Sequence, residues 1–211
     1  VYKRQTGKIP FVNTFTVFLT TLGLISARAQ VCYGNLNVKF GGAYCGMSDA
    51  LDGATHHATE DIAVMRALPN MTVLVPSDAT STRWATKYAV DTYGPMYLRL
   101  SRDVYPDLYD ENTKFECGKG AIVRDGTDVT VIACGILVHK ALEAAEQMAA
   151  RGVSVRVVDM YSIKPIDREL ILRCAQETGA IVTAEEHNVI GGLGEAVCSV
   201  LSEKCPTPVR K

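Results

Sequence analysis

Apolar and polar residues alternate along the chain in blocks that predict strands and helices in turn. Short apolar runs suit buried strands, and the longer stretches between them carry helical spacing or helix-capping residues. In the first half we predict strands at 9–14, 36–40, 71–75 and 96–100, with helices at 15–33, after Thr59, and from Ser77 or Asp78 to 93. In the second half we predict strands at 128–133, 154–158 and 180–184, and helices at 138–150, 167–177 and 194–202. This alternation is typical of parallel α/β sheets.

Two segments interrupt the pattern. Residues 41–58 form a glycine-rich stretch with no regular periodicity, and residues 103–116 are polar, acidic and contain Pro106. The second stretch has the composition of a linker between domains. We therefore predict two parallel-sheet α/β domains, at 1–103 and 118–211, joined by a linker at 104–117.

Composition narrows the classes of partner. The 211 residues are 47% hydrophobic with a formal net charge of −1, which suits a sizeable core and favours neither nucleic acid nor an acidic tail. The apolar stretch 11–25 is too short and too polar to span a membrane. Seven cysteines without a CxxC pair favour reduced thiols in a cytoplasmic enzyme. Because the chain lacks an initiator Met and stops after a Pro-Thr-Pro segment, we expect a fragment truncated at both ends.

The loop 41–58 is the first candidate site. It holds His56, His57, two aspartates and four glycines directly after a predicted strand, where α/β proteins build ligand sites. A solvated loop with turn glycines explains the residues equally well. A metal site is a third interpretation, because the histidines lie three or four residues before Glu60. It is disfavoured because this spacing lacks the second histidine of the zinc helix motif.

Several longer segments resemble one protein family, and they occur in the same order and with the same spacing as in that family. The pyrimidine-binding domain of transketolases resembles Pro-Phe-Val-Asn-Thr-Phe (10–15), Leu-Asn-Val-Lys (36–39), Asp-Gly-Ala-Thr-His (52–56), residues 60–73 and Pro-Ser-Asp (76–78). The transketolase C-terminal domain resembles Ile-Lys-Pro-Ile-Asp (163–167) and Thr-Ala-Glu-Glu-His-Asn-Val-Ile-Gly-Gly-Leu-Gly (183–194). The chain is most similar to the C-terminal subunit of bacterial two-subunit transketolases from about residue 7 onward, whereas residues 1–5 do not fit the pattern.

The resemblance implies a cofactor wall. In the family, aromatic residues stack on the aminopyrimidine ring of thiamine diphosphate, and the matching positions are Phe15 and Phe18. Their spacing places both on one helical face, and a phenyl ring offers the flat surface that a heterocycle needs. Without the family, both residues would be interpreted as core. A third aromatic position of the family is Thr21 here.

The resemblance also implies catalytic and substrate-binding residues. Asp52 and His56 match the family residues that face the sugar hydroxyls and the carbonyl, where a carboxylate accepts and an imidazole donates. Arg102 matches the arginine that binds the substrate phosphate in the family. The alternative is an ordinary surface arginine at a domain junction. Tyr44 stands where the family has a substrate-binding histidine, and Leu51 replaces a glutamate. We therefore expect a sugar other than the usual pentose and hexose phosphates.

The function implied is thiamine-diphosphate-dependent transfer of a two-carbon ketol unit between sugar phosphates, as in the pentose phosphate pathway. The glutamate that activates the cofactor in the family lies upstream of Val1, and the pattern that holds the diphosphate and Mg²⁺ is absent from this chain. We therefore expect an N-terminal transketolase subunit as partner, a dimer of such halves, and no activity from this chain alone.

Other functions of the same fold remain open. A 2-oxo acid dehydrogenase β-subunit and a deoxyxylulose-phosphate synthase use the same cofactor, but the loop 52–56 argues against both. A non-catalytic assembly module is the remaining alternative. In the second domain, Glu185, Glu186, His187 and the glycine-rich segment 191–194 could bind an anion at a helix start. We favour structural and assembly contacts for this cluster.

Overall fold

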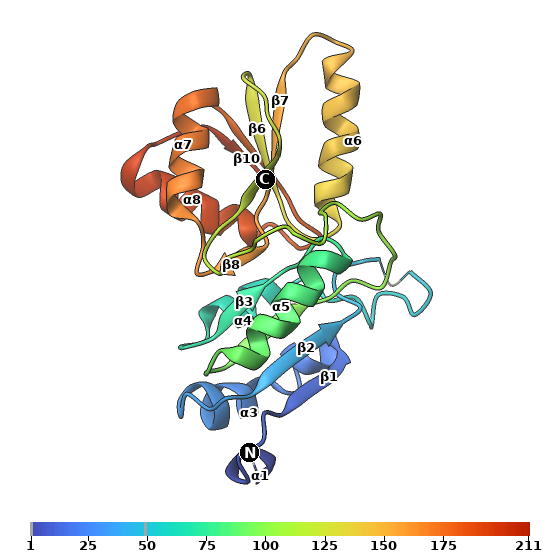
Figure 1. Cartoon of the computed structure of the whole chain (residues 1–211), viewed down its shortest axis with the longest axis vertical. Helices are drawn as coiled ribbons and strands as arrows, with labels where there is room; N and C mark the ends of the chain where they lie inside the picture. Colours follow the sequence, from blue (N-terminus) through green and yellow to red (C-terminus); the bar gives the residue numbers. More distant parts are fainter. Residues whose placement is uncertain (1, 49) are drawn as a thin grey trace.

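The computed structural model describes residues 2–48 and 50–211. Two five-stranded sheets, each flanked by helices, lie one above the other (Figure 1). Their strand orders are β1-β2-β4-β3-β8 and β10-β9-β6-β7-β5. The predicted class, two α/β domains, is confirmed.

Four parallel strands and one antiparallel strand form the first sheet. They are β1 (Phe11–Phe15), β2 (Lys39–Ala43), β3 (Thr72–Leu74), β4 (Met96–Arg99) and β8 (Ser162–Lys164), of which only β8 runs antiparallel. In register, Phe15 lies beside Ala43, and Gly42 lies beside Arg99. The carboxyl ends of β1, β2 and β4 therefore reach the same edge. We had predicted that the second strand ends at residue 40, but it continues through the glycines to Ala43.

The helices of the first half differ most from the prediction at residues 15–33. They are α1 (Tyr2–Gln5), α2 (Thr16–Thr20), α3 (Leu24–Ser26), a π-helix (Ala27–Cys32), α4 (Asp61–Ala67) and α5 (Ala79–Asp91). The single helix predicted at 15–33 is wrong, because Phe15 ends β1 and the helix is interrupted before α3. The hydroxyls of Thr20 and Thr21 donate to carbonyls four residues back, which bends helices, and Gly23 weakens the next turn.

Helix starts were predicted with mixed success. Asp78 begins α5 as predicted, since its carboxylate accepts the Ser81 N–H at 2.7 Å in a capping box. Thr59 is not the cap of α4. Glu60 occupies that position, and its side chain makes no capping bond.

The second sheet has the same plan. It contains β5 (Ala121–Arg124), β6 (Val129–Ala133), β7 (Val155–Asp159), β9 (Ile181–Ala184) and β10 (Val209–Arg210), flanked by α6 (Leu137–Ala149), α7 (Arg168–Thr178) and α8 (Leu193–Lys204). All neighbours are parallel except β5, which runs antiparallel to β7. The short strands β5, β8 and β10 were not predicted.

Strand β8 joins the two halves. It follows β7 in the chain, yet it pairs with β3 of the first sheet, where Val73 lies opposite Lys164. The Lys164 ammonium donates to the carbonyls of Arg66 and Leu68, at the carboxyl end of α4. One buried cluster includes Val73 from the first half and Met160 from the second. The domain limits set from the sequence stay a prediction, because the halves share a sheet and a core.

Two simpler expectations can be compared directly with the fold. All seven cysteines lie within the described residues, and none of them forms a disulfide. Within residues 2–48 and 50–211, no helix is long and apolar enough to cross a membrane.

Candidate functional site

The carboxyl edge of the first sheet gathers the residues predicted for the site. Phe15 is the last residue of β1, Tyr44 directly follows β2, and Arg102 lies three residues after β4. Because parallel neighbours end at one edge, these side chains meet there. Helix α2 contributes Phe18, and the loop between β2 and α4 contributes Asp52 and His56.

The aromatic part of the site is a set of tilted rings. The Phe15 ring centroid lies 5.9 Å from that of Phe18, 4.8 Å from that of Tyr44 and 5.4 Å from that of His56. The His56 ring also stands edge-on to Phe18, at 5.3 Å and 83°. Phe18 is 38% exposed, so it is not a core residue despite its apolar character. A partly open aromatic surface of this kind fits a flat heterocycle.

The polar part of the site lies beside these rings. An Arg102 Nη1 nitrogen lies 3.1 Å from Asp52 Oδ2, and the guanidinium carbon lies 5.0 Å from the centroid of Tyr44, in cation–π range. The side chains of Arg102 and Asp52 are 33% and 41% exposed, so solvent weakens their attraction. An incoming anion can therefore compete with Asp52 for the guanidinium. On the other side, His56 Nδ1 lies 3.0 Å from the Thr55 hydroxyl.

Tight backbone packing fixes the strand end that carries Tyr44. A Cβ at Gly41 would lie 2.1 Å from Asn13 Oδ1, and one at Gly42 would lie 2.7 Å from both Thr16 Oγ1 and the Tyr97 ring. At Gly42 the buried Thr16 and Tyr97 side chains leave room only for glycine. Tyr44 itself has φ +57°, a left-handed conformation that is unusual for an aromatic residue. The backbone turns there, out of the strand and into the loop.

A buried ion pair between Arg99 and Asp61 lies next to the site. Arg99, the last residue of β4, donates from Nε to Asp61 Oδ2 at 2.7 Å and from Nη2 to Oδ1 at 3.1 Å, and the Tyr97 hydroxyl donates to the same carboxylate at 2.7 Å. Burial by itself lowers the pKa of Arg99, but Asp61 outweighs it and raises that pKa well above its usual value. Burial first, and then the Asp61 charge, raise the pKa of Tyr97. The ion pair is therefore a fixed support.

Sequence reasoning missed this support, although signals for it existed. An arginine inside an apolar strand and an aspartate on the buried side of a short helix both need partners, because an unpaired buried charge is strongly unfavourable. Nearby Cys45 is also buried, and burial raises its thiol pKa to about 12. That thiol stays protonated near neutral pH and cannot act as a nucleophile.

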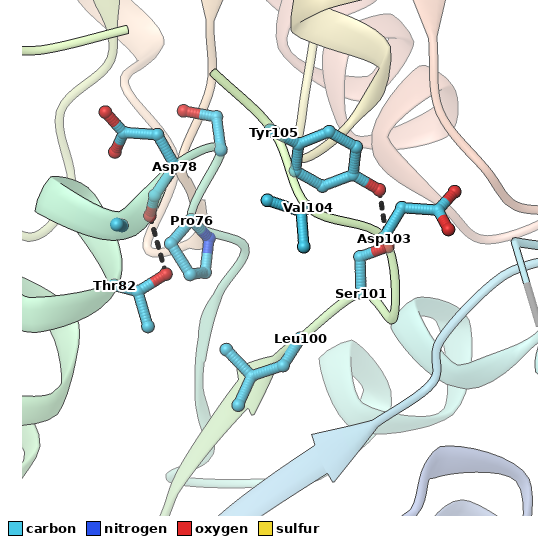
Figure 2. Close-up of a pocket in the computed structure, with 10 residues that line it drawn as sticks. Pro76, Asp78, Thr82, Leu100, Ser101, Asp103, Val104 and Tyr105 are labelled. Carbon is cyan, nitrogen blue, oxygen red and sulfur yellow. Dashed lines mark hydrogen bonds between the residues drawn. The ribbon is translucent and has the colours of Figure 1, made fainter. Parts of the chain in front are cut away.

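A second hollow lies next to the site and was not predicted. Figure 2 shows it at the ends of β3 and β4, between Pro76 and Thr82 on one side and Val104 and Tyr105 on the other, with a volume of about 350 Å³. The Tyr105 hydroxyl lies 2.6 Å from that of Ser101. Both neighbours of Arg102 line this hollow. The segment 100–105 thus contributes residues to this hollow and Arg102 to the site.

The metal interpretation of the loop finds no support. Within the part of the chain that the structure describes, no three His, Cys, Asp or Glu side chains gather as a metal site would require. Glu60 Oε2 instead accepts the neighbouring Thr59 N–H at 3.0 Å. The aromatic surface of Phe15 and Phe18 remains the part of this chain that suits a cofactor ring.

Comparison with known proteins identifies the family of the chain. The transketolase pyrimidine-binding domain matches residues 3–107, and the transketolase C-terminal domain matches residues 118–211. These two domains, in this order, define the class to which the fold and site belong. The chain belongs to the transketolase family, and its relatives include subunits of split transketolases. The resemblance found in the sequence is confirmed.

Relatives and solved structures give the extent of the match. The chain is 42% identical over 205 residues to the 6-deoxy-6-sulfo-D-fructose transketolase subunit SqwH of Clostridium sp. (strain MSTE9), covering 97% of this chain and 64% of that protein. It is 42% identical over 207 residues to one subunit of the apulose-4-phosphate transketolase of Phocaeicola vulgatus, covering 98% and 66%. A split-gene transketolase solved as an inactive beta4 tetramer aligns with a TM-score of 0.91 at 49% identity, over 99% of this chain and 67% of that chain. The chain thus spans less than two thirds of the length of these two curated relatives.

Proposed function

We propose that this chain acts as the C-terminal subunit of a thiamine-diphosphate-dependent transketolase that moves a two-carbon ketol unit between sugars with an anionic end. One observation carries the proposal. The ring pair, the Asp52–Arg102 pair and His56 meet at a single sheet edge, although they come from three separate segments of the chain.

The cofactor surface is proposed first. When bound, thiamine diphosphate supplies the electron sink that breaking a carbon–carbon bond beside a carbonyl requires. Phe15 and Phe18 hold its pyrimidine ring by stacking and exclude water from that face. The diphosphate and Mg²⁺ are assigned to the N-terminal partner subunit.

The sugar is held by the polar residues. Asp52 accepts hydrogen bonds from its hydroxyls, and His56 donates to an oxygen that gains charge during the reaction. Because the Thr55 hydroxyl lies against His56 Nδ1, we assign Nε2 to the sugar oxygen. His56 also contacts both phenyl rings, which supports a location between cofactor and substrate.

Arg102 is proposed to bind the anionic end of the sugar. Its planar fork suits a phosphate or another oxyanion, and the Tyr44 ring supports the guanidinium at 5.0 Å. Two relatives are named for unusual sugars, 6-deoxy-6-sulfo-D-fructose and apulose-4-phosphate. Together with Tyr44 in place of the family histidine, this supports a ketose other than the usual pentose and hexose phosphates.

Assembly follows from the incomplete site. We propose a heteromer with an N-terminal subunit, and self-association of the pairs, supported by relatives that are subunits and by the tetramer of the split-gene structure. A cytoplasmic location and a role in carbohydrate metabolism stay predictions.

Reconstitution tests the proposal. The full-length chain is mixed with its N-terminal partner, thiamine diphosphate and Mg²⁺, and ketol transfer is measured with phosphorylated and sulfonated ketoses as donors. We expect transfer by the mixture and none by either subunit alone. A folded complex that transfers from none of these donors would contradict the proposal, and turnover of pyruvate would favour the 2-oxo acid dehydrogenase or deoxyxylulose-phosphate synthase alternative.

A further inference from the structure

The turn between β9 and α8, residues 185–192, reaches from the second domain to the site loop. The Glu186 carboxylate accepts the backbone N–H of Met47 at 2.7 Å, although the two residues lie 139 positions apart. Gly46 makes this contact feasible, because a Cβ there would lie 2.3 Å from the Glu186 carboxyl carbon. Burial raises the pKa of Glu186, while the Met47 N–H and the Arg99 charge oppose this rise.

The next two residues of the turn hold the other end of the loop. His187 Nδ1 lies 2.7 Å from the Asn188 carbonyl and donates to it, so Nε2 carries the lone pair that accepts the Ala63 N–H at 3.3 Å. This N–H is one of the open donors at the start of α4. The Asn188 side chain and backbone N–H both donate to the Thr59 carbonyl, at 2.6 and 2.8 Å.

The turn is itself fixed to the first domain. Arg99 of the buried ion pair donates from Nη2 to the Glu186 carbonyl at 2.8 Å. Arg66 of α4 donates to the carbonyls of Gly191 and Gly192. The contact is close, since a Cβ at Gly191 would lie 2.4 Å from the Ala63 Cβ. Both the turn and its partner helix are therefore held in one arrangement.

The anion site considered for this turn is not favoured. The N–H groups of Leu193 and Gly194, at the start of α8, already donate to the Glu185 carboxylate at 2.7 and 2.8 Å. The Gly191 N–H donates to Glu195 at 2.8 Å. A bound anion would have to displace these internal carboxylates.

We infer that Glu186 is a positioning residue of the transketolase site, through which the second domain orders the loop that carries Asp52 and His56. The loop is closed by a bridge between Gly46 and Ala58, and Glu186 binds the residue next to that bridge. Asp52 and His56 both lie between the bridged residues. The inference rests on the proposed function, and it gives the second domain a share in substrate binding.

Two substitutions at one position, with a matched control, test the inference. Glu186→Ala removes the acceptor, whereas Glu186→Gln keeps an oxygen for the Met47 N–H. Glu185→Ala is the control, because Glu185 also accepts two backbone N–H groups but within its own domain. We measure, in the reconstituted holoenzyme, the KM for the donor sugar and the affinity for thiamine diphosphate, and in the full-length chain the hydrogen exchange of residues 44–58.

We expect Glu186→Ala to raise the KM for the sugar about tenfold, in line with the loss of one hydrogen bond to a charged group. Amide exchange in 44–58 should rise by a similar factor, while cofactor affinity changes less than twofold. Glu186→Gln should restore most of the wild-type KM and most of the wild-type exchange rate. Glu185→Ala should leave loop exchange unchanged. If Glu186→Ala does not fold, Asn188→Ala provides a second test. We expect it to speed amide exchange at the other end of the loop, residues 56–60.

Unchanged loop exchange in both Glu186→Ala and Asn188→Ala would overturn the inference. So would an equal rise of exchange in Glu185→Ala, because the effect would then be general destabilisation. Hydrogen exchange does not depend on catalysis. If the wild-type complex transfers no ketol unit but loop exchange still responds to Glu186, the proposed function has failed and the anchoring role of Glu186 has not.

Discussion

The two sheets present the same kind of edge but use it differently. At the carboxyl ends of β1, β2 and β4, side chains such as Phe18 and Asp52 remain partly exposed. At the carboxyl ends of β6 and β7, the corresponding residues are buried. Cys134 is buried, and Asp159 accepts from Ser77 and Tyr109 at 2.6 and 2.8 Å.

This difference shows the limit of a general rule. Ligand sites of α/β sheets form outside the carboxyl ends of strands, and that rule locates an edge without assigning its role. The second edge lies against another domain, as the Val75 N–H bond to the Tyr161 carbonyl at 2.8 Å illustrates. The first edge is left with an open surface. Neighbouring structure, rather than the fold class, decides which edge can bind a ligand.

The largest expected effect concerns the support of the open edge. Asp61→Ala leaves the Arg99 charge and the Tyr97 hydroxyl without their acceptor, so we expect the free energy of unfolding to fall by about 3–5 kcal/mol. Chemical denaturation of the chain measures the change. As a control, Asp91→Ala breaks the exposed Lys87–Asp91 pair and should leave the midpoint unchanged. A loss below about 1 kcal/mol for Asp61→Ala would show that the ion pair is not the support.

The second effect concerns the anionic end of the sugar. Arg102→Ala should raise the KM of a phosphorylated or sulfonated ketose about 10–100-fold, because a hydrogen-bonded ion pair with the substrate is lost. The KM of Arg102→Lys should lie between those of the wild type and of Arg102→Ala, since an ammonium keeps the charge but lacks the planar fork. Steady-state kinetics of the reconstituted complex gives both values. An equal rise of KM for a neutral ketose would contradict a role of Arg102 in anion binding.

The third effect separates exposed from buried aromatic residues. Phe18→Ala should weaken thiamine diphosphate binding about tenfold, since stacking area is lost, with little change in unfolding because the ring is partly exposed. Phe40→Ala is the matched control, because this buried residue of β2 contributes to stability rather than to the open surface. Calorimetric titration and denaturation distinguish the two. Unaltered cofactor binding by Phe18→Ala would argue for another cofactor surface.

The smallest effect is a pH dependence at the buried edge. Burial raises the pKa of Asp159 to about 7, whereas the unfolded chain releases this proton near pH 4. Between these values the folded chain binds more protons, so this residue makes stability fall as the pH rises from about 4 to 7. Asp159→Asn keeps an acceptor for Ser77 and Tyr109 and should flatten that decline. Thermal unfolding midpoints of both proteins at pH 5 and pH 7 measure the decline. The same decline in Asp159→Asn as in the wild type would contradict the prediction.

Much of the fold followed from the sequence, because periodicity and capping act locally. The start of α5 at Asp78 is one example, since its cap bonds to Ser81, three residues away. Long-range structure was missed. Strand β8 has three residues and is stabilised by β3, and α4 receives an acceptor from His187 of the other domain. No local pattern encodes either contact.

The site shows the same division. The resemblance to transketolases identified Phe15, Tyr44 and Arg102, and the structure brings them together. Their roles stay predictions. The Asp61–Arg99 pair and the Glu186 contact were not predicted, because each joins residues that are far apart in the chain. The sequence alone gives no measure of that proximity.

The antiparallel strand β8 has a consequence for dividing this protein. Expression of the first domain without the second would leave β3 with an unpaired margin of backbone N–H and C=O groups. Such a margin recruits other chains, so the shortened product is expected to aggregate or to exchange strands. A first domain that is cut at the polar stretch near residue 110 must therefore be given the missing strand, for example as a separate peptide.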